Sequence, residues 1–154
     1  ILRIDLTNGA VTKQPTSVYA QDWLGGRGFN TRILYQELEK NIDPLSPQNV
    51  LIFSVGPLTG SMFPGSGRVE VAAKSPVTGI QGMSNMGGYW GPELKYAGYD
   101  SCVIKGKASK PVYIRMNNEK VEIKNAAPPR PVSDASPGGA SWIRSIWDRS
   151  FVTV

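Results

Sequence analysis

The sequence predicts an α+β fold with mixed or antiparallel β-sheets and a few short helices. Three observations lead to this class: strand patterns outnumber helical ones, Gly, Pro and Asn separate the short apolar runs, and no regular βαβ repeat is present. A length of 154 residues favours one domain with a hydrophobic core of its own.

A β-hairpin opens the chain. Leu2–Leu6 and Ala10–Lys13 have the composition of strands, and the intervening Asn8-Gly9 supplies the positive φ angles that a tight hairpin turn requires. Ser17 is then a candidate N-cap for a short helix, which Gly25-Gly26 would end.

The next two elements have the clearest apolar patterns. A helix is predicted over Phe29–Lys40, because its apolar residues fall on one face of a 3.6-residue period: Phe29, Ile33, Leu34 and Leu38. Pro44 and Pro47 prevent its continuation. The continuous apolar run Val50–Val55 predicts a strand that is covered on both faces.

More strands and one short helix are predicted up to residue 125. Pro92 and Gly98 bracket a helix over Glu93–Ala97, in which Leu94 faces inward. The predicted strands are Arg68–Lys74, which alternates as a half-buried strand does, Asp100–Lys105, Pro111–Met116 and Lys120–Lys124.

The composition excludes several classes of function. The chain has no histidine and a single cysteine, Cys102, so it lacks the commonest general base and cannot form a disulfide or a cysteine cluster within itself. No run approaches the roughly 18–20 apolar residues of a membrane-spanning helix, so we expect a cytoplasmic protein without membrane contact. The net charge of +5 favours an anionic partner. Its basic residues are scattered, which fits a phosphate on a small ligand and does not predict nucleic-acid binding.

The stretch Gly56–Gly91 holds about half of the chain's 17 glycines and is the candidate site. Its turns, Pro64–Gly67 and Asn85–Gly88, can present backbone N–H groups to an anion, and Arg68 can bind phosphate through bidentate bonds. The side-chain oxygen of Asn85 can coordinate a hard cation such as Mg²⁺. The alternative is that the glycines only form tight turns and that Arg68 is a solvated arginine. The GxxxxGK[ST] and complete GxGxxG patterns of common nucleotide sites are absent.

Several segments together resemble the N-terminal domain of the tungsten-containing aldehyde:ferredoxin oxidoreductase family. In order, they are GGRGFNTRILY, DPLSPQNVLIFSVGPLTG, PGSGRVEVAAKSPVTG, SNMGGYWGPELKYAGYD and VIKGKASKPVYIRMNNEKVEIKNA. The resemblance covers Ile1–Ala126 and implies the fold of that domain. We therefore expect residues 1–126 to form a tungstopterin-binding base domain, followed by an irregular linker and a tail unlike the family over residues 127–154.

The resemblance implies a cofactor and residues that hold it. In the family this domain is the base on which a tungsten, or molybdenum, bis-pyranopterin sits. Arg68 matches the arginine that contacts a pterin phosphate, and Asn85 matches the residue whose oxygen helps to hold the Mg²⁺ that bridges the two pterin phosphates. Gly87 and Gly88 match the neighbouring turn that contacts the cofactor.

The resemblance also implies a reaction for a longer enzyme. That enzyme oxidises an aldehyde to a carboxylate with oxygen derived from water and passes two electrons through a [4Fe–4S] cluster to ferredoxin. The cluster cysteines, a second pterin-binding segment and the residues that select the substrate are not in this sequence, so we expect a truncated, split or frame-shifted gene. The expected partners are the remaining domains or subunits, and the chain alone is not expected to catalyse. The alternatives are a non-catalytic pterin- or phosphate-binding module, or a degenerate fragment that acts through association with a partner.

The character of the chain changes after Ala126. A linker rich in Pro, Gly, Ser and Ala leads to apolar residues that approximate a helical stripe: Trp142, Ile143, Ile146, Trp147 and Phe151. These residues predict a docking helix or a disordered tail. Tyr89, Trp90 and the tail tryptophans are expected to remain uncovered in the separate domain, which would favour a homodimer.

Overall fold

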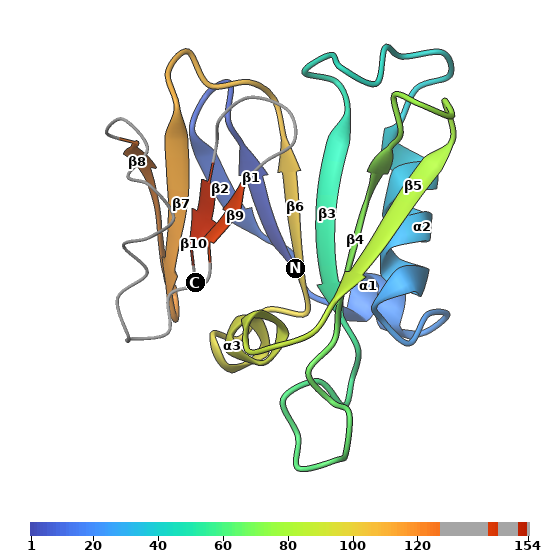
Figure 1. The fold of residues 1–154 in the computed structure, drawn as a ribbon, viewed down its shortest axis with the longest axis vertical. Helices are drawn as coiled ribbons and strands as arrows, with labels where there is room; N and C mark the ends of the chain where they lie inside the picture. Colours follow the sequence, from blue (N-terminus) through green and yellow to red (C-terminus); the bar gives the residue numbers. More distant parts are fainter. Residues whose placement is uncertain (127–141, 145–150, 154) are drawn as a thin grey trace.

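A six-stranded mixed sheet, here called sheet A, is the centre of the fold. The computed structural model describes residues 1–126, 142–144 and 151–153 (Figure 1). Sheet A has the strand order β2-β1-β6-β3-β4-β5, with β1 and β6 parallel and all other neighbours antiparallel. Its strands are β1 (Leu2–Asp5), β2 (Ala10–Lys13), β3 (Val50–Val55), β4 (Val69–Lys74), β5 (Gln81–Met86) and β6 (Ser101–Lys105). The predicted α+β class with a mixed sheet is confirmed.

A second sheet, sheet B, has the order β8-β7-β10-β9. Its strands are β7 (Val112–Asn117), β8 (Lys120–Asn125), β9 (Trp142–Arg144) and β10 (Phe151–Thr153). Of the two alternatives for the tail, a docking helix or a disordered segment, the helix is wrong at residues 142–144 and 151–153, which are strands. The physical reason is that β10 pairs in parallel with β7 and occupies the backbone groups along an edge that would otherwise lack partners. Residues 127–141 and 145–150, which include most of the predicted linker, lie outside the described residues.

Three helices lie in the described ranges: α1 (Ser17–Ala20), α2 (Arg27–Glu37) and α3 (Trp90–Tyr96). Helix α2 packs on one face of sheet A, beside β3 and β4 (Figure 1). Its predicted stripe is confirmed, because Phe29, Ile33 and Leu34 are buried. The helix begins before the predicted start and ends at Glu37, since Leu38 already has an extended backbone.

The other face of sheet A is covered by α3 and sheet B. Residues from all three parts form one buried cluster, consisting of Leu2, Ile4, Phe53, Val55, Val69, Trp90, Leu94, Tyr99, Cys102, Ile104, Ile114 and Met116. Trp90 is only 2% exposed and its ring centroid lies 5.0 Å from that of Phe53. The expectation that Trp90 remains uncovered is wrong, because Trp90 is the first residue of α3 and anchors that helix on β3. Tyr89, its neighbour, is 83% exposed as expected, and the homodimer stays a prediction.

Strand β3 is buried on both faces, as its apolar sequence predicts. Phe53 and Val55 face the cluster with α3, whereas Val50 and Ile52 face α2. Ser54 is fully buried, and its hydroxyl is satisfied by the Ser101 hydroxyl at 2.6 Å. This strand fixes the positions of the helices on both sides of the sheet.

Asp100, the residue before β6, connects the start of α1 with α3. Its carboxylate accepts a hydrogen bond from the Thr16 hydroxyl at 2.6 Å and pairs with Lys95 of α3. Burial acts to raise the pKa of Asp100, but the bonds from Lys95 and Thr16 outweigh it and hold the pKa below its usual value. Thr16, and not the expected Ser17, is the N-cap of α1, and its hydroxyl serves Asp100 instead of capping the helix.

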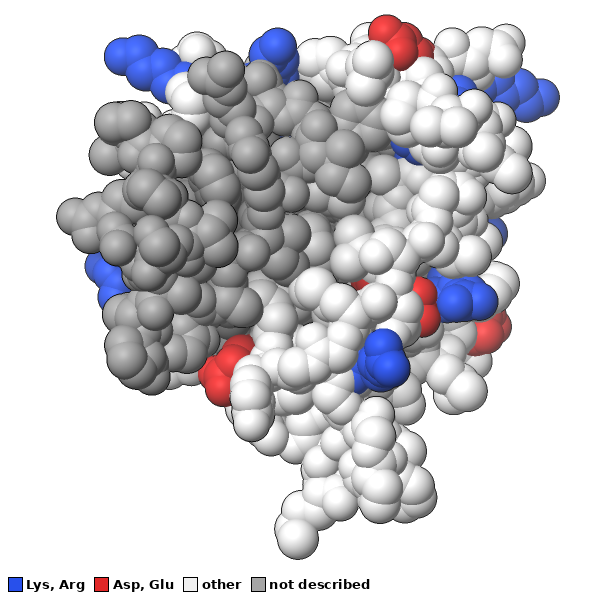
Figure 2. Space-filling view, in the orientation of Figure 1, with Lys and Arg blue, Asp and Glu red and all other residues white. Residues whose placement is uncertain are grey.

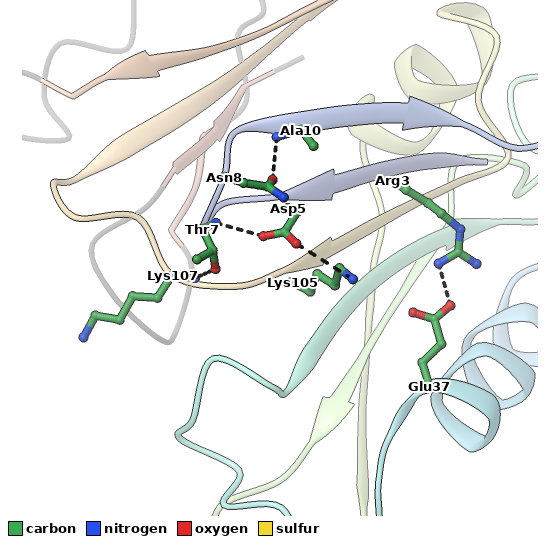
Figure 3. Close-up of polar contacts among 8 residues, drawn as sticks. All are labelled: Arg3, Asp5, Thr7, Asn8, Ala10, Glu37, Lys105 and Lys107. Atoms are coloured by element: carbon green, nitrogen blue, oxygen red, sulfur yellow. Dashed lines mark hydrogen bonds and ion pairs between the residues drawn. The ribbon is translucent and has the colours of Figure 1, made fainter.

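The predicted hairpin turn lies at the opposite end of sheet A from α3. The Asn8 side-chain oxygen accepts a bond from the Ala10 N–H at 2.9 Å, and Gly9 has a φ of 73° (Figure 3). Arg3, near the start of β1, donates to Glu37 at 2.5 Å and ties the last turn of α2 to the sheet (Figure 3). In the described ranges, none of the helices is both long and apolar enough to cross a membrane.

Cys102 offers a test of this core. Its side chain is fully buried in β6, and burial raises the pKa of its thiol to about 12. We expect a thiol reagent such as DTNB at pH 8 to react with the folded chain at least about 100-fold more slowly than with the urea-unfolded chain, because reaction requires opening of the sheet. Equal rates in the two conditions would contradict the assignment of β6 to the core.

Candidate functional site

One end of sheet A gathers the glycine-rich segments. Strand β3 ends there at Val55, β4 begins at Val69, and β5 ends at Met86. Helix α2 starts at the same end, because the N–H of Gly26 donates to the carbonyl of Val55 at 3.0 Å. We call this region the glycine edge and define it as residues 25–27, 67–70 and 85–88. It lies at the lower end of the sheet in Figure 1.

Four polar side chains form a chain of contacts across the glycine edge. Arg68 donates to the side-chain oxygen of Asn85 at 2.8 Å, and the side-chain nitrogen of Asn85 donates to Glu70 at 2.6 Å. The guanidinium of Arg27 lies 3.6 Å from the same oxygen of Glu70. Glu70 and Asn85 are direct partners in the β4–β5 register, so the sheet itself brings them together.

The charge of Arg68 is available to a ligand. Its side chain is exposed, and its contact is the neutral amide of Asn85. In the part of the chain that the structure describes, Arg68 forms no ion pair with a carboxylate. Figure 2 shows acidic and basic side chains close together on the visible face near this end of the sheet, while the loop that projects beyond them carries no charge. Among the described residues, the guanidinium of Arg68 is therefore exposed to an incoming anion without being paired to an acid.

Close backbone contacts hold the two glycine turns against each other. A Cβ on Gly67 would lie 3.0 Å from the carbonyl oxygen of Gly88, and one on Gly91 would lie 3.2 Å from the carbonyl oxygen of Arg68. Gly88 has a φ of 92° and open space where a side chain would be. Glycine thus permits the close approach at Gly67 and Gly91 and favours the positive φ of Gly88. The resulting surface is made largely of peptide groups.

The structure brings all four predicted site residues together. Arg68 and Asn85 are hydrogen-bonded, and a Cβ on Gly87 would lie 3.9 Å from the Arg68 guanidinium, with Gly88 next along the chain. The expectation that Asn85 begins a turn is wrong, because Asn85 belongs to β5 and the turn begins after Met86. Strand β5 was not predicted, since its sequence QGMSNM contains no β-branched or aromatic residue.

Glu70 and Arg27 were missed by the sequence analysis. Glu70 lies within the predicted half-buried strand Arg68–Lys74, whose alternating pattern does not single it out. The sequence does contain a clue to Glu70. It lies two residues after Arg68, and residues two apart along an extended chain point to the same side. Arg27 becomes recognisable only when the start of α2 is placed beside β4.

The donor set fits a phosphate with a bound Mg²⁺. A guanidinium and glycine N–H groups suit phosphate oxygens, and one amide oxygen at Asn85 suits a hard cation. Among the described residues no group of three or more His, Cys, Asp or Glu side chains can hold a metal ion. A cation at the glycine edge would therefore take most of its oxygen ligands from the phosphates and from water, as Mg²⁺ commonly does.

Gly67 tests whether this backbone contact supports the edge. Gly67→Ala places a methyl group against a carbonyl of Gly88, so we expect a loss of about 1–3 kcal/mol in the free energy of unfolding, measured by urea denaturation. Gly56→Ala is the matched control, since its Cβ would meet only the Thr59 hydroxyl at an ordinary 3.7 Å and should change stability by less than about 1 kcal/mol. Equal effects of the two substitutions would refute the close approach.

Comparison with known proteins shows extensive similarity. The family model described as "Aldehyde ferredoxin oxidoreductase, N-terminal domain" matches residues 1–150. The chain is 48% identical over 128 residues to a tungsten-containing aldehyde ferredoxin oxidoreductase of Pyrococcus horikoshii, covering 82% of this chain and 21% of that protein. It is 40% identical over 131 residues to an aliphatic sulfonate oxidoreductase, WOR-like subunit, of Pyrococcus furiosus, covering 82% of this chain and 20% of that subunit.

A solved structure shares the fold. The active site complex BamBC of benzoyl coenzyme A reductase, in complex with 1,5 dienoyl-CoA, matches with a TM-score of 0.77 and 42% identity, covering 80% of this chain and 19% of that one. The chain thus spans about one fifth of the length of the relatives that it matches. With a family model matching nearly its whole length and close relatives over 82% of it, the chain belongs to the aldehyde ferredoxin oxidoreductase family, where it corresponds to the N-terminal domain.

Proposed function

We propose that the chain is the cofactor-binding N-terminal domain of a tungsten bis-pyranopterin oxidoreductase and that the glycine edge holds the phosphates of that cofactor. The observation that carries the proposal is the exposed guanidinium of Arg68, which lies among glycine turns and, within the described ranges, contacts a neutral amide and no carboxylate. A cofactor with anionic ends and a broad polar body suits such a surface.

Arg68, Asn85 and the glycine pair Gly87-Gly88 would bind different parts of the ligand. Arg68 binds a pterin phosphate through charge-assisted bonds, and the backbone N–H groups of Gly87 and Gly88 donate to the same region. With the guanidinium turned to the phosphate, the side-chain oxygen of Asn85 would be free to hold a Mg²⁺ ion bound with the phosphates. The domain thereby fixes the position of the cofactor relative to whatever covers it.

The bound cofactor would supply redox chemistry in which an aldehyde and water give a carboxylate, three protons and two electrons, the electrons passing through a [4Fe–4S] cluster to ferredoxin. The residues of this chain bind and orient. Its single cysteine is buried in β6, so the cluster ligands are assigned to the remaining domains or subunits. The names of the relatives mention three different substrates: aldehydes, aliphatic sulfonates and benzoyl coenzyme A. The proposal therefore concerns the cofactor, and the residues that select the substrate are expected outside this chain.

Titration with a pterin monophosphate in the presence of Mg²⁺ tests the proposal. We expect Arg68→Ala to weaken binding about 10- to 100-fold, because a hydrogen bond to a charged group contributes about 1.5–3 kcal/mol. The matched control is Arg115→Ala on the exposed side of β7, which removes the same charge at a distance from the edge and should leave the affinity nearly unchanged.

Equal binding by wild type and Arg68→Ala would refute the site. Loss of affinity in both arginine variants would show that net charge alone attracts the ligand. Specific binding by the chain combined with the absence of tungsten and molybdenum from its native complex would favour the non-catalytic binding module.

A further inference from the structure

We propose that Glu70 is a positioning residue for the candidate site: its carboxylate fixes the side-chain amide of Asn85 so that the amide oxygen faces Arg68 and the ligand. The inference concerns the ligand-free chain first, and its consequence for Mg²⁺ and phosphate rests on the proposed function. Neither Glu70 nor this role follows from the residues that the family resemblance assigns to the cofactor.

The partners of Asn85 determine how its amide is oriented. A carboxylate only accepts hydrogen bonds and a guanidinium only donates them. The nitrogen of Asn85 therefore belongs on Glu70, at 2.6 Å, and its oxygen belongs on Arg68, at 2.8 Å. The reversed amide would place oxygen against carboxylate and NH₂ against guanidinium. The orientation thus follows from the hydrogen-bonding chemistry of the two neighbours.

Glu70 is itself held in place. Its side chain is 18% exposed and lies between β4 and the start of α2, where its Cγ is 3.9 Å from the position of a Cβ on Gly26. The backbone carbonyl of Glu70 accepts a bond from the fully buried Asn30 at 3.1 Å. One carboxylate oxygen makes both polar contacts, and the other is buried without a hydrogen-bond partner among the described residues. The carboxylate can therefore act as a fixed acceptor for Asn85.

If Glu70 acted only through its charge, its removal would change the affinity for an anion in the opposite direction from the loss of a positioning residue. A negative charge at hydrogen-bond distance from Asn85 repels a phosphate, so removing the charge should strengthen the binding of an anion. Removing a positioning acceptor should instead weaken the part of binding that depends on Mg²⁺. The side-chain amide of Asn85 would then sample several orientations, and its oxygen would face the cation in only some of them. The two roles can be separated by measuring binding with and without the cation.

The first experiment needs no ligand. In NMR spectra of the 154-residue chain, we expect Asn85 to show the side-chain couplings of a single χ1 rotamer and slow exchange of its NH₂ protons. In Glu70→Ala the side-chain couplings of Asn85 should become averaged, and its NH₂ protons should exchange at least about 10-fold faster. Glu70→Gln should give intermediate values, since the amide oxygen of the new side chain can still accept a hydrogen bond from Asn85. Glu119→Gln, in the distant β7–β8 turn, is the matched control for charge. A single, unchanged rotamer of Asn85 in folded Glu70→Ala would overturn the proposal.

The second experiment uses inorganic pyrophosphate as the probe. For Glu70→Ala we expect equal or tighter binding than in wild type without Mg²⁺, and a gain on adding Mg²⁺ that is about 3- to 10-fold smaller than in Glu70→Gln, which removes the same charge but keeps an acceptor for Asn85. An undiminished gain would overturn the positioning role at the site. If wild type binds no pyrophosphate under either condition, the proposed phosphate site fails, while the couplings of Asn85 still decide whether Glu70 orients it.

Discussion

Burial of β3 on both faces is the constraint on which the rest of the structure depends. A strand without a solvent-facing side must be covered twice, and here α2 covers one side while α3 and sheet B cover the other. The chain leaves this strand at Val55 and enters the glycine-rich loop. The start of α2 is hydrogen-bonded to that same residue through Gly26, so the rigid centre of the domain determines where the candidate site lies.

The site combines rigid backbone with an uncompensated charge. A Cβ on Gly67 would lie only 3.0 Å from the carbonyl oxygen of Gly88, so the backbones of the two turns pack closely beside Arg68. Within the described residues Arg68 has a neutral partner, and the acid of the cluster, Glu70, is turned toward Arg27 and Asn85. A phosphate can therefore replace an amide contact without breaking an ion pair, which lowers the cost of binding.

The sequence predicts the parts of the fold whose side chains form regular patterns. The hairpin at Asn8-Gly9, the stripe of α2 and the buried run of β3 are all confirmed, because turn chemistry and burial act locally. Strand β5 escapes prediction since its pairing with β4, and not its composition, makes it a strand. The contact of Glu70 with Asn85 depends on that pairing, so the cluster around Arg68 becomes visible only when the register is known.

The most direct test of the proposed cofactor site is a crystal structure of the native complex, with anomalous diffraction data collected at the tungsten absorption edge. We expect an anomalous tungsten or molybdenum signal within a bis-pyranopterin on the glycine edge, with a phosphate against Arg68 and a cation against the side-chain oxygen of Asn85. A cofactor bound to another face of this domain, or a glycine edge packed against protein without phosphate, would contradict it.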